Sequence, residues 1–129
     1  MKKIYVLLVI TLMGGSSLLA QEIKATAKKQ FMQVTTVESV VSGGLGRSKM
    51  IITNPDGSQK ETDLENLFSM VGINFNNIKD NEDKVIRTLK SYYDAGWNME
   101  QVTSFTLSPG TNGGMGIFMT RYLLSKAEA

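Results

Sequence analysis

The side chains available for chemistry are few in this chain of 129 residues, because histidine and cysteine are both absent. Thiol catalysis, Ser-His-Asp catalysis and zinc sites with cysteine or histidine ligands each require one of these residue types. Carboxylate chemistry, lysine or tyrosine bases and metals with oxygen ligands remain. We therefore predict no catalytic residue, no cofactor and no metal site, and we expect that the protein is not an enzyme.

The acidic residues are densest at Asp80, Glu82, Asp83 and Asp94. Asp80 and Asp83 would share one face of a helix, where capping and a favourable interaction with the helix dipole explain them. A hydrolase with paired carboxylates needs a second acid across a cleft, and the sequence does not identify one.

Two turn-forming segments superficially resemble ligand-binding loops. Residues 42–49 are rich in glycine and would offer Arg47 and Lys49 to a phosphate, but a strand-like segment follows where a phosphate loop needs a helix. Residues 54–65 carry oxygen ligands in a calcium-loop register, but Gln59 occupies the position that requires glycine. We predict a hairpin loop and a turn, with an anion site at Arg47 and Lys49 as the alternative.

Four aromatic side chains lie at or near the predicted end of a helix: Tyr92, Tyr93, Trp97 and Phe105. Such a cluster can line a sugar or peptide groove, but it more often belongs to the core. We predict a core role, and we keep as an alternative function a small-ligand pocket formed by Tyr93, Trp97 and Tyr122.

The predicted last strand, residues 117–124, is the most informative segment, because both of its faces are largely apolar. Alternation along a strand places Phe118, Thr120, Tyr122 and Leu124 on one face. It places Ile117, Met119, Arg121 and Leu123 on the other face. Helices cover only one face of the predicted sheet, so the second face needs a partner subunit, the tail of residues 21–30 or a ligand. The candidate ligand or interface residues are therefore Tyr93, Trp97, Ile117, Met119, Arg121 and Tyr122.

The residue types along the chain predict the strands that must position these side chains. Residues 31–41 and 48–53 are rich in strand-forming side chains and predict a hairpin. Asn54-Pro55-Asp56-Gly57 predicts a tight turn after it. Residues 97–107 and 117–124 predict two more strands, separated by a loop at residues 108–114.

Two helices are predicted between these strand pairs. Residues 62–71 predict the first helix, because Thr62 and Glu65 have the spacing of a capping box and Gly72 follows the last apolar position. The second helix starts at Asp80 or Asn81 and ends before Gly96. Its apolar stripe consists of Val85, Ile86, Leu89, Tyr92 and Tyr93.

The predicted fold class is α+β: an antiparallel four-stranded sheet, with the chain order β-β-α-α-β-β and two helices on one face. We predict one domain over residues 31–126, preceded by a flexible tail at residues 21–30.

A family resemblance is carried by the second half of the chain. Its residues read Tyr93-Asp94-Ala95-Gly96-Trp97-Asn98-Met99-Glu100-Gln101-Val102 and, after a glycine-rich gap, Ile117-Phe118-Met119-Thr120-Arg121-Tyr122. Residues 84–122 thereby resemble the DUF4177-type small domains, which implies a helix, a Gly-Trp strand, a loop and a final strand. The whole chain is similar to small exported proteins of Bacteroides-type bacteria. These resemblances imply a fold and a compartment, and they imply no chemistry.

The first 20 residues predict a secretory signal peptide. Lys2 and Lys3 precede a run of 10 apolar or weakly polar residues that ends at Met13, and small residues follow up to Ala20. A membrane-spanning helix needs about 20 apolar residues, so we expect cleavage and no stable membrane anchor. The expected location is the periplasm or the outside of a bacterial cell.

The net charge and the absence of cysteine exclude several kinds of partner and anchor for the exported form. Removal of the leader would remove Lys2 and Lys3, which leaves 12 basic residues of the original 14 against 12 acidic residues. A neutral domain has no overall field that attracts nucleic acid. The absence of cysteine excludes lipoprotein anchoring and disulfides. We therefore expect a protein partner or a homo-oligomer and no nucleic acid.

Overall fold

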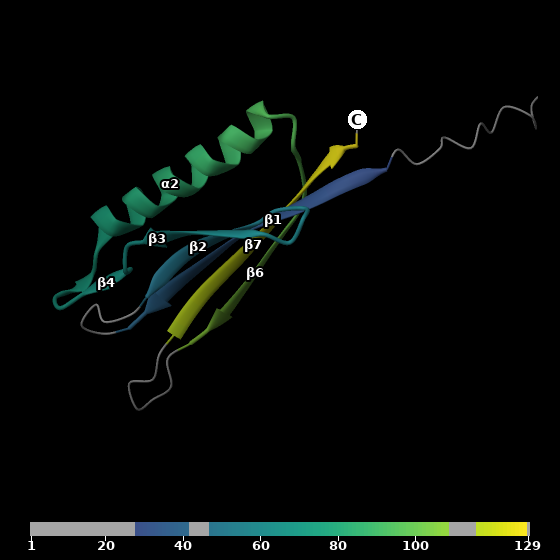
Figure 1. The fold of residues 1–129 in the computed structure, drawn as a ribbon. Coiled ribbons are helices and arrows are strands. Elements are labelled where there is room, and N and C mark those ends of the chain that lie inside the picture. The colour runs from purple at the N-terminus through teal and green to yellow at the C-terminus, as the bar shows by residue number, and fades with distance from the viewer. Residues whose placement is uncertain (1–27, 42–46, 109–115, 129) are drawn as a thin grey trace, which may run out of the picture.

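The computed structural model describes residues 28–41, 47–108 and 116–128, and these form a strand-rich fold with a single helix among the described residues. Five strands make one antiparallel sheet in the order β3-β2-β1-β7-β6 (Figure 1). Their bounds are Lys29–Val40 for β1, Ser48–Thr53 for β2, Gln59–Leu64 for β3, Asn98–Leu107 for β6 and Gly116–Ala127 for β7. A small hairpin of β4 (Phe68–Ser69) and β5 (Gly72–Ile73) leads into the helix α2 (Phe75–Asp94).

The predicted fold of four strands and two helices is therefore wrong, although four of the five sheet strands lie close to where strands were predicted. β1 and β2 pair as the expected hairpin, with Val34 opposite Ile52. β7 runs along the whole of β1, so the first and last strands form the centre of the sheet. Residues 1–27, which contain the predicted leader and most of the predicted tail, lie outside the described residues, as does most of the loop predicted at 108–114.

The error arose in residues 59–71, where a strand and a small hairpin replace the predicted first helix. The turn at Asn54 to Gly57 closes with a hydrogen bond from Gly57 N to Asn54 O at 2.9 Å, and Gly57 has a φ of +82°. The chain thus returns along β2, and Thr62 lies opposite Met50 in β3. Val71, expected on the apolar stripe, is 97% exposed. A tight turn that pairs neighbouring strands outweighs a capping-box spacing worth about 1 kcal/mol.

Helix α2 also begins earlier than predicted. The side chain of Asn74 accepts hydrogen bonds from Asn76 N at 3.1 Å and Asn77 N at 3.3 Å, which satisfies two free donors of the first turn. The predicted caps at Asp80 and Asn81 therefore lie inside the helix. The predicted C-terminal stop is confirmed, since α2 ends at Asp94 and Gly96 has a φ of +88°.

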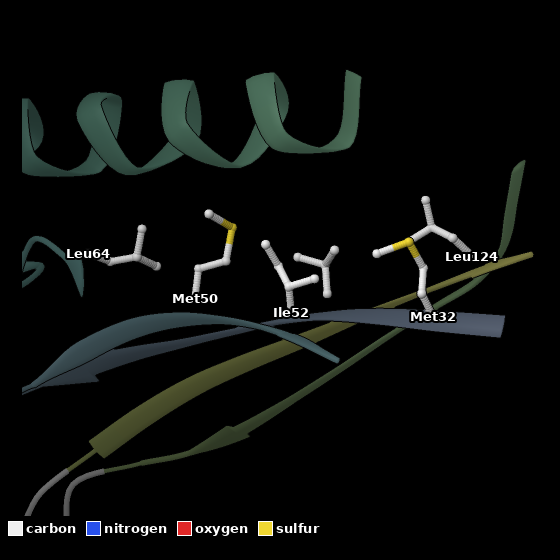
Figure 2. Packing of buried hydrophobic residues seen from close by; sticks show 6 residues of the cluster. Met32, Met50, Ile52, Leu64 and Leu124 are labelled. Carbon is white, nitrogen blue, oxygen red and sulfur yellow. The ribbon is translucent and has the colours of Figure 1, made fainter. Parts of the chain in front are cut away.

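The hydrophobic core lies between α2 and the face of the sheet that bears the even-numbered residues of β1. Figure 2 shows the side chains of this face rising from the strands toward the helix. The buried residues are Met32, Val34, Met50, Ile52, Leu64 and Leu124. The residues that pack against them are Val85, Leu89, Tyr92, Trp97 and Tyr122. Each fully buried side chain of this kind contributes about 1.5–3 kcal/mol.

Asn81 joins α2 to the sheet through three hydrogen bonds. Its Oδ1 accepts from Glu65 N at 2.7 Å, and its Nδ2 donates to Glu65 O at 2.9 Å and to Glu38 Oε1 at 3.1 Å. The side chain is buried, so no water replaces these bonds easily. Asn81 therefore holds the helix over β1 and the end of β3.

Replacing Asn81 by leucine should destabilise the protein strongly. The change removes the three hydrogen bonds of the buried Asn81 side chain to Glu65 and Glu38, and each such bond contributes about 0.5–1.5 kcal/mol. We expect Asn81→Leu to lower the free energy of unfolding in urea by about 2–4 kcal/mol. The control is Asn76→Leu at an exposed position of the same helix, which should change it by about 0.5 kcal/mol or less. Equal stability of the two variants would contradict this role for Asn81.

Candidate functional site

Helix α2 covers only one half of the sheet, and this leaves a groove beside it. On one side, Asn81 Nδ2 donates to Glu65 O at 2.9 Å, and Lys84 Nζ donates to Asp63 O at 3.3 Å at the end of β3. On the other side, toward β7 and β6, two hollows of about 400 and 460 Å³ follow the helix. Ile86 and Leu89 line both hollows, so we treat them as one feature, the α2–β7 groove.

One end of the α2–β7 groove is apolar. Trp97, Tyr93 and Met99 line it, and Lys90 at its rim is bound to Asp94 by an ion pair of 2.6 Å. Trp97 is held in place because its N donates to Tyr92 O at 3.0 Å, directly after the helix. Tyr93 is 69% exposed, so its ring is free to contact a ligand.

The other end of the groove is polar and acidic. Glu38 on β1 and Glu82 on α2 both line the hollow, together with Thr120 and Tyr122 of β7. Burial and the neighbouring charge of Glu38 raise the pKa of the Tyr122 hydroxyl, which keeps it a neutral hydrogen-bond donor. This end can therefore bind hydroxyl, amine or guanidinium groups of a ligand.

Sequence reasoning missed the two carboxylates of the groove. Glu82 counts among the dense acidic residues of the sequence, but α2 begins at Phe75, so Glu82 lies beyond the first turn and its interaction with the helix dipole. Alternation in β1 was a usable signal, because Glu38 has the same parity as Met32 and Val34 and therefore faces the helix.

The opposite face of the sheet carries no described element, and we call it the open face. Ile117, Met119, Arg121 and Leu123 lie on it, as the alternation in the last strand predicts. Neighbouring strands extend it, since Val37 and Phe105 lie on either side of Met119. A shallow hollow of about 180 Å³ lies here. Its lining residues are Thr103, Ser104, Phe105, Met119 and Arg121.

The six candidate residues thus fall into three places. Tyr93 and Trp97 meet at the apolar end of the groove, and Tyr122 lies at its polar end. The other three, Ile117, Met119 and Arg121, lie on the open face. The alternative pocket of Tyr93, Trp97 and Tyr122 therefore corresponds to the whole length of the groove, and Phe105 lies on the other side of the sheet.

The two loop segments that resembled ligand sites have structural roles in their described parts. Lys49 forms an ion pair with Glu61 across β2 and β3, and this hydrogen bond raises the pKa of Lys49. At the β2–β3 turn, Asp56 accepts from Ser58 N at 2.9 Å and from Ser58 Oγ at 2.6 Å, which lowers its pKa. Arg47 and Lys49 both border one hollow, but Asp63 borders it too and Lys49 is paired with Glu61, so the hollow is a weaker anion site than two free cations would form.

Strand β6 has a β-bulge next to the groove. The register against β7 shifts between Met99 and Gln101, so Glu100 is the extra residue. The carboxylate of Glu100 accepts hydrogen bonds from Lys29 and from the hydroxyl of Ser125. These bonds lower the pKa of Glu100 and join the start of β1 to β6 across β7.

Comparison with known proteins gives no further constraint, because no family model, curated protein or solved structure matches the chain. The resemblance to DUF4177-type domains stays a prediction. Within the described residues, no group of three or more acidic residues is placed to hold a metal ion. In the same part of the chain, no helix has the length and apolar character needed to cross a membrane.

Glu100 should make the stability of the protein depend on pH in mild acid. Its pKa in the folded state lies below the ordinary value of 4.5, so its stabilising effect is present above that value and is lost as the pH falls through the folded pKa. We expect the urea midpoint of Glu100→Gln to fall less than that of the parent as the pH is lowered below about 5. Urea unfolding at a series of pH values measures this. Parallel curves for parent and variant would contradict the assignment.

Proposed function

We propose that the protein is a non-enzymatic exported domain that acts through protein–protein contact or self-association at the open face. The observation that carries this proposal is the apolar character of a sheet face over which no described element lies. Val37, Met119, Phe105 and Leu107 contribute to it from three strands. Phe105 is 49% and Leu107 is 55% exposed. Contiguous exposed apolar surface of this kind marks an interaction site.

The composition of the open face supports a protein partner. Methionine, aromatic residues and arginine are enriched in interface cores, and Met119, Phe105 and Arg121 lie together here. Two other pairs of charges on this face neutralise each other, since Lys29 is bound to Glu100 at one end and Lys49 is bound to Glu61 near β3. Arg121 has no ion-pair partner among the described residues. Its guanidinium group could therefore form an ion pair with a carboxylate of another protein.

The first 20 residues support export, because they have the three regions of a signal peptide. The absence of histidine and cysteine also favours a binding role over catalysis.

The open face is tested by placing charge in its centre. The double variant Met119→Glu with Arg121→Glu should lower the captured partner or the oligomer fraction of the full-chain protein at least tenfold, because an interface does not tolerate buried unpaired charge. Sedimentation velocity and affinity capture from the exporting cell measure this. Arg87→Glu, on an exposed part of α2, is the charge control and should have no effect. A parent that is monomeric and captures nothing, or a double variant that behaves like the parent, would contradict the proposal.

The α2–β7 groove favours a second function, the binding of a small amphipathic ligand. Its apolar end at Trp97 and Tyr93 fits an alkyl or aromatic group. Its acidic end at Glu38 and Glu82 fits a cationic or hydroxylated group. The hollows have the size of small-molecule sites, which are about 300–1,000 Å³.

Trp97 is the single tryptophan of the chain and reports directly on the groove. We expect dodecyltrimethylammonium, below its micelle concentration, to bind with higher affinity than dodecyl sulfate, which has the same tail and the opposite charge. The affinity of each probe is measured from the concentration at which it quenches Trp97 fluorescence. Tyr93→Ala should weaken this binding about tenfold, a change of 1.4 kcal/mol. Phe105→Ala on the open face is the control. Equal affinity for the two probes, or equal effects of the two variants, would contradict a ligand site in the groove.

A further inference from the structure

Strand β6 is an open edge of the sheet. It pairs with β7 on one side, and no described strand lies on its other side. All ten of its residues are exposed. The outward N–H and C=O groups of such an edge are able to pair with another strand.

The opposite edge, β3, provides an internal comparison. β3 has six residues and carries Lys60, Glu61 and Asp63, so half of its side chains are charged. Charges on an edge strand hinder pairing with a further strand. The β3 edge is therefore protected against pairing.

Strand β6 lacks this protection over most of its length. Its one charged residue is Glu100, at the bulge, and Lys29 neutralises it. From Gln101 to Leu107 the strand has no charge, no proline and a regular register against β7. A segment of seven residues with these properties is long enough for a stable strand pairing.

Both faces of this edge segment carry exposed apolar side chains among neutral polar ones. Val102, on the side of α2, is 51% exposed, while Phe105 and Leu107 on the open face are 49% and 55% exposed. A neighbouring strand that matches these side chains has an uncharged mixture of apolar and polar residues on both faces. β6 of another molecule has this pattern.

We propose that β6 pairs antiparallel with β6 of a second copy of this chain, which joins the two sheets into one of ten strands. An antiparallel strand edge is self-complementary under a two-fold axis, so the same surface serves both copies. The uncharged segment from Gln101 to Leu107 brings no like charges together at this axis.

The pairing extends both surfaces described above. A two-fold axis perpendicular to the sheet places the two α2 helices on the same side, so the two α2–β7 grooves lie over one continuous floor. The open faces join on the other side into one surface twice as wide. The inference goes beyond the proposed function: it assigns self-association to the β6 edge and leaves the open face free for contact with a protein partner.

The absence of cysteine allows a direct test of this pairing. Single cysteines are placed in the full-chain protein at each position from Gln101 to Leu107, and mild oxidation is followed by non-reducing electrophoresis. Residues near the two-fold axis lie opposite their own copies at distances that a disulfide spans. We expect a sharp maximum of cross-linked dimer at one or two adjacent positions. Sedimentation equilibrium of the cysteine-free parent should give twice the mass of one chain.

Matched controls separate edge pairing from other contacts. Gln59→Cys and Glu61→Cys, in the charged edge strand β3, should give at least tenfold less cross-linked dimer. Cross-linking that is uniform along β6, or equal in β3, would overturn the inference. A dimer that cross-links at Met119→Cys and not in β6 would overturn it and still support the open face as the contact. A monomeric parent that captures a different protein through the open face would overturn the β6 pairing and would still support the proposed function.

A second variant tests whether the edge itself causes association. Val102→Lys with Phe105→Lys adds like charges on both faces of β6 near the axis, and these positions are exposed, so the fold tolerates them. We expect the dimer dissociation constant to rise at least tenfold with an unchanged circular dichroism spectrum. An unchanged dissociation constant would overturn the proposal.

Discussion

The pairing between β1 and β7 is the interaction on which the rest of the structure depends. The two strands are in register from Lys29 opposite Ala127 to Val40 opposite Gly116, which makes this the longest pairing of the sheet. It joins the meander of β1, β2 and β3 to the hairpin of β6 and β7. Without it neither half has a sheet wide enough to pack against α2, since a two-stranded hairpin is marginally stable in water.

The same pairing explains why both sides of the sheet carry surface that needs a partner. α2 is attached to the meander half through Asn81 and Lys84, so it covers β1 and β2 more fully than β7 and β6. The uncovered half provides the floor of the α2–β7 groove on one side and most of the open face on the other. One helix on a five-stranded sheet thus leaves two candidate surfaces uncovered, in addition to the uncharged edge of β6.

Sequence patterns predicted the strands better than the helices, and the physical reason differs at each place. Alternation in residues 117–124 assigned Tyr122 and Arg121 to opposite faces correctly, because a strand has a fixed period of two. The helix expected at residues 62–71 failed, since apolar spacing cannot distinguish a helix from an edge strand followed by a turn. The candidate site was found in part: Trp97 and Tyr93 meet, while the role of Glu38 depends on the packing of α2 against β1, a contact between distant segments.

The contact between the first strand and the last strand affects the timing of folding. Glu128 N donates to Lys28 O at 2.8 Å, and Lys28 pairs with Glu128, so the first and last described residues meet. The central strand β1 therefore lacks its longest partner until the C-terminal strand has been synthesised. Such long-range pairing is slow to form. The five-stranded sheet is therefore completed only after the last strand has been synthesised, and until then the first three strands lack the partner on the other side of β1.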